Sequence, residues 1–194
     1  MDSPRAEDTT PNSHDVPLPA SNSPESGGLE IIEPPHPINW NLLTSEDLEA
    51  ELLELNRWVN WLRHTYGLPA SVIPPAWHRH PELLWELSAL HLHWLAAYDP
   101  EQNASAPLGW HRDFADARQR LRDWVAASGT RLDNDRPTRQ TTWPGEQPQN
   151  PVKETAITNR DEDFVRFVID EVAQRREAED AFFTGLDPES GEVP

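Results

Sequence analysis

Apolar residues recur every three or four positions in four stretches of the chain, and this spacing predicts four helices. We expect them at about 45–66, 81–98, 106–128 and 159–184. The first three lie close together in the sequence and are expected to form a Trp-rich core domain over residues 38–129. The predicted fold class is therefore all-α: a small three-helix core with an additional C-terminal amphipathic helix.

The helix expected at 81–98 is the centre of this arrangement. It ends the stretch WHRHPELLWELSALHLHWLAAY, and its apolar residues cover most of its circumference. Such a helix is buried against several neighbours. His80 is its expected N-cap, and Pro81 suits the first turn, where the backbone N–H is not needed.

Residues that favour helix ends delimit the other three helices. Thr44, followed by Asp47, predicts the start of the first helix, while Ser105 and Gly129 bound the third. Asn159 is expected to cap the fourth helix, which is amphipathic only in its first half. This helix could dock on the core, dimerise or fold on a partner, and the sequence leaves these alternatives open.

The remaining segments are rich in polar residues and proline and have no apolar periodicity. Segments of this composition cannot bury enough apolar surface to order themselves. We therefore expect a disordered acidic Pro/Ser-rich tail over 1–37, a disordered linker over 130–158 and a disordered tail over 185–194.

The chain is strongly acidic, with 34 Asp and Glu residues against 16 Lys and Arg, a net charge of −18. Direct nucleic-acid binding is not expected, because it requires Lys and Arg to neutralise phosphates. The absence of cysteine excludes disulfides, thiol catalysis and Cys-based metal sites. No signal peptide or membrane-spanning stretch is visible, so we expect a cytoplasmic protein without membrane insertion.

Histidine and glutamate are the only candidates for metal or acid–base chemistry. His91 and His93 lie two positions apart, so a helix directs them to nearly opposite sides and they cannot share one metal. Glu86 and His93 share a face, which we interpret as a solvated, ion-paired surface. The residues considered as metal ligands are His78, His80, Glu86 and His93, but the sequence predicts no metal site, no cofactor and no catalytic residue.

Aromatic residues are the main candidates for contacts with a partner. Seven tryptophans between Trp58 and Trp124 exceed what a three-helix core usually needs, and an exposed aromatic patch marks a contact surface. For Trp58 and Trp61 we favour a place in the core. The candidates for partner binding are Trp58, Trp61, Trp77, Trp110, His111, Arg112, Phe164, Val168, Phe182 and Phe183.

Five motifs carry a resemblance to a known family: RWVNWLRHTYGL at 57–68, IPPAWHRHPEL at 73–83, ELSALH at 86–91, WLAAY at 94–98 and WHRDFADARQRLRDW at 110–124. Together they resemble a family of uncharacterised actinobacterial proteins that plasmids, phages and integrative elements encode. The resemblance covers about 70 residues of the core and neither tail. It implies a mobile-element setting and transfers no reaction.

Three functions follow as hypotheses. The first is a non-enzymatic accessory protein of a mobile genetic element that acts through contacts with a protein partner. The sequence identifies neither this partner nor the oligomeric state of the protein. The alternative is an acidic DNA mimic that inhibits a host nucleic-acid-binding protein, suggested by the net charge. The third is a His/Glu-based metal enzyme, whose only support is the proton-transfer capacity of these side chains.

Overall fold

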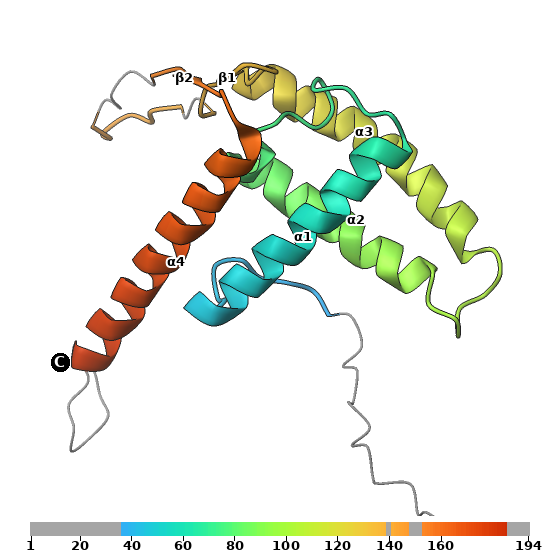
Figure 1. Cartoon of the computed structure of the whole chain (residues 1–194), viewed down its shortest axis with the longest axis horizontal. Helices are drawn as coiled ribbons and strands as arrows, with labels where there is room; N and C mark the ends of the chain where they lie inside the picture. Colours follow the sequence, from blue (N-terminus) through green and yellow to red (C-terminus); the bar gives the residue numbers. More distant parts are fainter. Residues whose placement is uncertain (1–35, 139–140, 148–152, 186–194) are drawn as a thin grey trace, which may run out of the picture. The chain divides into compact units, whose positions relative to one another are not determined.

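The computed structural model describes residues 36–138, 141–147 and 153–185 and confirms the all-α fold class. The elements, in chain order, are α1 (Ser45–Thr65), the 3₁₀ turn η1 (Trp77–Arg79), α2 (Pro81–Ala97), α3 (Ala106–Ser128), β1 (Asn134–Asp135), β2 (Thr155–Ala156) and α4 (Arg160–Gly185) (Figure 1). The expected tails at 1–37 and 185–194 lie outside the described residues, apart from residues 36, 37 and 185. No helix in the described part is long and apolar enough to cross a membrane.

The predicted helix caps mark the observed ends, although they work in different ways. The Thr44 hydroxyl accepts a hydrogen bond from the Asp47 backbone N–H at 3.1 Å. Gly129 ends α3 with a φ of 76°, a left-handed conformation that a residue without Cβ adopts at low cost. His80 and Ser105 stand at the N-cap positions of α2 and α3 without a capping side-chain bond.

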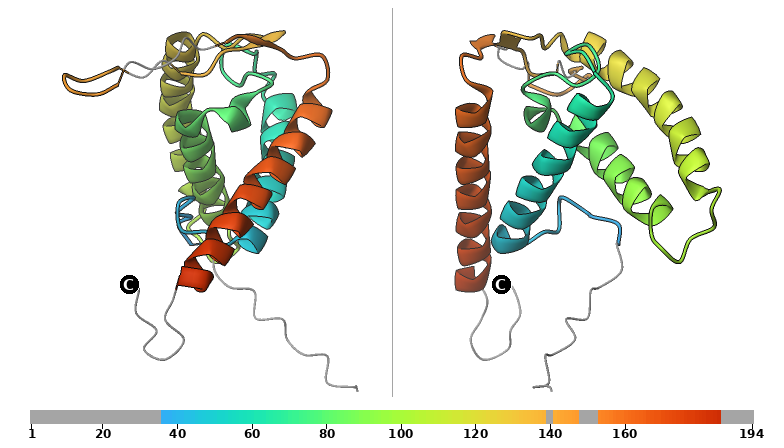
Figure 2. Two further views of the ribbon diagram at one scale, coloured as in Figure 1. Left: turned by 90° about the vertical axis from the view of Figure 1, so that its left-hand side faces the viewer. Right: turned by 45° about the vertical axis from the view of Figure 1, so that its right-hand side comes forward.

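Helices α2 and α3 run antiparallel and lie side by side in both views of the chain (Figures 1 and 2). Their polar seam carries the Glu86–Arg120 ion pair, at 2.6 Å, and the His93–Asp113 pair, at 3.1 Å. Inside the seam, the buried Trp110 indole donates to the Leu90 carbonyl at 3.4 Å. The expected ion-paired face of α2 is thus directed at α3.

Helix α4 packs along α1 and belongs to the core. Of the three roles that the sequence left open for this helix, the structure shows docking on the core. Phe164, Val168 and Val172, one helical turn apart, are buried in the common hydrophobic cluster. The polar second half also holds α1: the carboxylate of Glu179 accepts hydrogen bonds from the Ser45 N–H and hydroxyl at 2.7 and 2.8 Å. The backbone N–H groups in the first turn of a helix have no hydrogen-bond partner within that helix. Glu179 of α4 accepts a hydrogen bond from one of these groups in α1, the Ser45 N–H.

The prediction of a structureless linker over 130–158 was wrong for its described residues around β1 and β2. The two short strands pair antiparallel, with Asn134 opposite Ala156. Asp135 is only 4% exposed, and Arg136 donates to the Ser128 carbonyl at 3.0 Å. Polar composition predicted disorder here, but these side chains find buried partners at His80 and at the end of α3. Residues 139–140 and 148–152 of this segment lie outside the described residues.

Candidate functional site

The first candidate site is the histidine cluster, which we define as His78 and His80 with their carboxylate partners Asp163 and Asp135. His78 lies on η1, and its Nε2 is 3.1 Å from Asp163 Oδ2 at the start of α4. Arg79 binds the same carboxylate through Nε at 2.9 Å and Nη2 at 2.7 Å. This pair of contacts ties η1 to α4.

His80 makes the equivalent connection to the segment after α3. Its Nε2 is 2.7 Å from Asp135 Oδ1, and its Nδ1 is 3.3 Å from the Thr138 hydroxyl. Thr138 in turn donates to Glu82 in the first turn of α2. Both nitrogens of His80 are thus used by protein groups, and the side chain has no exposure to solvent. His80 was expected to cap α2; it stands at that position, but its side chain pairs with a carboxylate from a distant part of the chain.

Burial sets the charge state of His78. Loss of solvation lowers the pKa of its imidazole to about 4, although Asp163 acts in the opposite direction and raises it. Nε2 faces Asp163, whereas Nδ1 is buried with no hydrogen-bond partner among the described residues. Protonation would place an unsatisfied N–H at Nδ1, which explains physically why the neutral ring is favoured.

The histidine cluster resembles the His–Asp pairs of acid–base catalysis only in composition. A general base must reach the proton of a substrate, and the His78 and His80 side chains have no exposed surface. Glu86 and His93, the other residues considered as metal ligands, bind Arg120 and Asp113 on the α2–α3 seam instead. Within the described ranges, no three His, Asp or Glu side chains are grouped to hold a metal ion.

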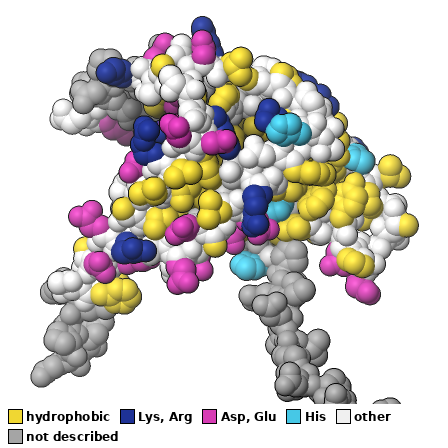
Figure 3. All heavy atoms as spheres, viewed as in Figure 1, with side chains coloured by type: hydrophobic (Ala, Val, Ile, Leu, Met, Phe, Trp, Pro, Cys, Tyr) yellow, Lys and Arg dark blue, Asp and Glu magenta, His cyan; other side chains and the backbone are white. Residues whose placement is uncertain are grey.

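The second candidate site is the aromatic row, which we define as Trp61 on α1 with Trp94 and Tyr98 on α2. The ring centroids of Trp61 and Trp94 are 5.0 Å apart, and those of Trp94 and Tyr98 are 5.5 Å apart. Trp61 is 39% exposed and Tyr98 is 45% exposed, while Trp94 is half-buried between them. In Figure 3 a group of hydrophobic side chains lies on the right-hand part of the molecule, where Figure 1 shows the second half of α2.

Buried aromatic residues support the aromatic row from below. The ring centroid of Trp58 lies 6.4 Å from that of Trp61, 6.5 Å from that of Trp94 and 4.9 Å from that of His91. Trp110 lies 6.4 Å from Tyr98. Because these buried rings hold the exposed ones, the row is a preformed surface, and its side chains would lose little conformational entropy on binding.

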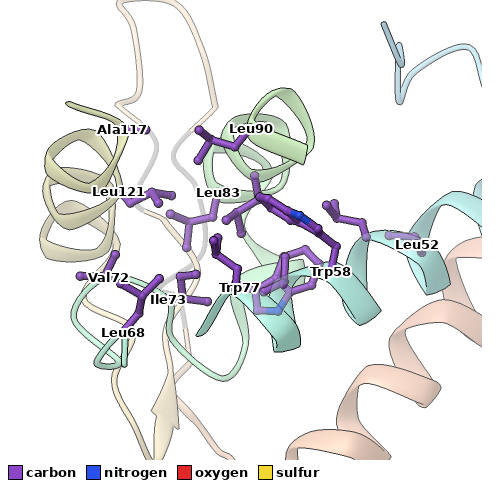
Figure 4. Packing of buried hydrophobic residues seen from close by; sticks show 14 of the residues in the cluster. Leu52, Trp58, Leu68, Val72, Ile73, Trp77, Leu83, Leu90, Ala117 and Leu121 are labelled. Carbon is purple, nitrogen blue, oxygen red and sulfur yellow. The ribbon is translucent and has the colours of Figure 1, made fainter. Parts of the chain in front are cut away.

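The structure separates the predicted partner-binding residues into two groups. Five of them are buried and cannot contact a partner: Trp58, Trp77, Trp110, Phe164 and Val168 (Figure 4 shows Trp58 and Trp77 among core side chains). The other five are exposed: Trp61 in the row, His111 and Arg112 on α3, and Phe182 and Phe183 near the end of α4.

Sequence reasoning missed Trp94 and Tyr98, since it assigned both to the buried stripe of the central helix. Their i,i+4 spacing on one face was the available signal. That spacing does not reveal which rings the neighbouring helices leave exposed. His111 adjoins this surface through Tyr66, whose hydroxyl is 3.1 Å from His111 Nε2.

Two further tryptophans have the same exposure but a different setting. Trp85 on α2 is 40% exposed and Trp124 on α3 is 44% exposed. Within the described part of the chain neither ring pairs with another aromatic ring, in contrast to Trp61. They therefore provide matched references for testing the row.

Comparisons of the chain with protein-family models, curated proteins and solved structures gave no match.

Proposed function

We propose that the protein is a non-enzymatic binding protein that holds a protein partner through the aromatic row. The observation that carries this proposal is three adjoining aromatic rings at the surface, held by buried tryptophans. Trp and Tyr dominate the binding energy of protein interfaces because each removes a large area from water while retaining a polar group. A single exposed ring is ordinary, whereas a contiguous exposed row is not.

The net charge defines the kind of partner. At −18, the chain attracts a partner whose surface is basic, and repels acidic surfaces and nucleic acid. Such long-range attraction accelerates encounter, while the desolvated aromatic contacts slow dissociation. We therefore propose a partner that presents apolar side chains within a basic surface.

The sequence resemblance supports a setting for this activity. The motifs RWVNWLRHTYGL and WLAAY contain Trp61, Trp94 and Tyr98, so the resemblance and the aromatic row concern the same region. We propose that the protein is an accessory protein of a mobile genetic element and binds its partner there.

The test compares two double variants in the full chain. Trp61→Ala/Tyr98→Ala removes both exposed rings of the row, and Trp85→Ala/Trp124→Ala removes two rings of similar exposure elsewhere. Each protein is used for affinity capture from the native host at low and high salt, followed by calorimetry with the retained protein. We expect the row variant to bind that protein at least ~30-fold more weakly than wild type, the effect of losing an interface hot spot. Circular dichroism verifies that both variants remain folded.

Three outcomes would overturn the proposal. One is equal binding by the row variant and the wild type. Another is retention of a nucleic-acid-handling protein that high salt releases and the row variant still binds, which would favour the acidic DNA-mimic alternative. The third is that the wild type captures no protein beyond those that the row variant also captures.

A further inference from the structure

A separate pocket opens on another part of the molecule, between the C-terminal end of α1, the connector that leads to η1, and the start of α4. Its volume is about 500 Å³, within the range of ordinary small-molecule sites. Ile73, Pro74 and Trp77 contribute apolar surface from the connector and η1, and Val59 adds to it from α1. An apolar lining of this size accommodates the hydrocarbon part of a small ligand.

The charged side chains that line the same pocket are Arg63, Arg160 and Asp161, which leaves one positive charge in excess in an otherwise acidic protein. Arg63 lines it from α1 and Arg160 from the first residue of α4. Arg160 is mostly buried; it donates to Asn56, and its carboxylate partner is Asp161, at 3.1 Å, whose side chain is largely exposed. Among the described residues Arg63 contacts His64 Nε2 at 3.1 Å and forms no ion pair with a carboxylate.

The Arg160 guanidinium is mostly removed from solvent, and its one carboxylate ion-pair partner among the described residues is Asp161. Burial lowers its pKa below the ordinary value, and the positive charge of Arg63 adds to this effect, while Asp161 and Asp163 oppose it. An anion in the pocket would lie among residues that include both arginines and would reduce the repulsion between them. Planar guanidinium groups bind carboxylates through paired, charge-assisted hydrogen bonds.

Trp77 forms part of the apolar wall of the pocket. Trp77 is buried, and its indole N–H has no acceptor among the described residues, as is also true of Trp40 and Trp58. Of these three indoles only Trp77 lines this pocket. The Trp77 indole nitrogen itself has almost no exposed surface, so this side chain contributes apolar surface to the pocket.

We propose that this pocket binds a small carboxylic acid with an apolar body, the carboxylate lying between Arg63 and Arg160 and the body on the surface of Ile73, Pro74 and Trp77. The proposal is independent of the aromatic row, which lies on other residues.

The test uses three probes that separate the two parts of the ligand. 3-Phenylpropionate carries both a carboxylate and an apolar body, 3-phenylpropionamide has the same body without charge, and acetate has the carboxylate alone. Calorimetry with the full chain at neutral pH should give saturable one-site binding of 3-phenylpropionate. The amide and acetate should each bind at least ~10-fold more weakly, because each lacks one of the two contributions.

A charge variant assigns the site. Arg63→Gln should weaken 3-phenylpropionate binding about 10-fold, as expected from the loss of a charge-assisted contact. Arg57→Gln is the matched control, since Arg57 is an exposed α1 arginine outside the pocket, and it should leave the affinity unchanged. Arg63 is preferred to Arg160 because its side chain is exposed and its replacement should leave the α1–α4 packing intact.

Failure of 3-phenylpropionate to saturate the protein would overturn the proposal. So would equal affinity for the acid and the amide, equal affinity for the acid and acetate, or unchanged affinity in Arg63→Gln. A loss of affinity in Arg57→Gln as large as that in Arg63→Gln would also overturn it, because binding would then follow overall charge.

Discussion

The histidine cluster and the aromatic row both contain ring side chains, but these rings are buried in the cluster and partly exposed in the row. In the cluster, His78 and His80 are sealed from solvent, and each faces a carboxylate from a distant part of the chain. In the row, Trp61 and Tyr98 are partly exposed and rest on buried rings. The difference teaches that polar groups must find partners when they are buried, whereas aromatic groups can remain at the surface at little cost.

The two regions accordingly serve different purposes. In the histidine cluster, His78 joins η1 to α4 through Asp163, and His80, at the start of α2, is joined to β1 through Asp135. The cluster therefore holds together segments that are distant in sequence. The aromatic row joins only α1 and α2, which the core already holds. We therefore expect changes in the cluster to lower stability, and changes to the exposed rings of the row to affect binding more than stability.

The largest effect is expected where the row meets the core. Trp58→Ala removes a buried ring beneath the row and should lower the free energy of unfolding by about 3 to 5 kcal/mol. Trp61→Ala removes a partly exposed ring and should cost only about 1 kcal/mol, because less area leaves the protein interior. Urea unfolding of both variants measures the difference. Equal losses would mean that the exposed ring belongs energetically to the core.

The next effect concerns the pH dependence of stability. His78 has a pKa of about 4 in the folded protein, against an ordinary value of 6.5, so the unfolded chain binds more protons between these values. The free energy of unfolding should therefore fall as the pH decreases from 6.5 to 4, by about 3 kcal/mol in total. Burial also lowers the pKa of His91, which acts in the same direction.

Urea unfolding at several pH values between 7.5 and 4 measures this dependence in the wild type and in His78→Gln. The variant should show a shallower slope, since it lacks the titrating ring. Leu108→Ala is the control and should retain the wild-type slope, because Leu108 is 71% exposed and carries no titratable group. A wild-type slope in His78→Gln would contradict the assignment.

The smallest effect compares two His–Asp pairs. Asp135→Ala leaves the sealed His80 without its partner and should lower the free energy of unfolding by about 2 kcal/mol, the cost of an unsatisfied buried group. Asp113→Ala breaks the pair with His93 at the surface and should leave the denaturation midpoint almost unchanged. Thermal denaturation at pH 7 measures both, and similar shifts would show that burial does not distinguish the two pairs.

The helices could be predicted because their signals are local. Leu48, Leu52 and Leu55 on α1 repeat at helical spacing, and Thr44 and Gly129 mark helix ends through their own hydrogen bonding and backbone preference. The sites could not be predicted in the same way. Trp77 and Trp61 look alike in the sequence, yet Trp77 is enclosed by the core, where it lies near Phe164 of α4, and Trp61 lies at the surface. Only the packing of the elements determines which rings are covered.

The sequence alone established the all-α fold class, the helix ends and the acidic charge, all of which depend on residues close in the chain or on composition. Only the tertiary structure decided that α4 packs on α1, that His80 meets Asp135, and that Trp61, Trp94 and Tyr98 share one surface. These contacts join residues tens of positions apart, and the loss of chain entropy that they require is offset only when the whole core assembles. Local pattern therefore determines the elements, while the partners of buried polar groups and the exposure of aromatic rings depend on how the elements pack.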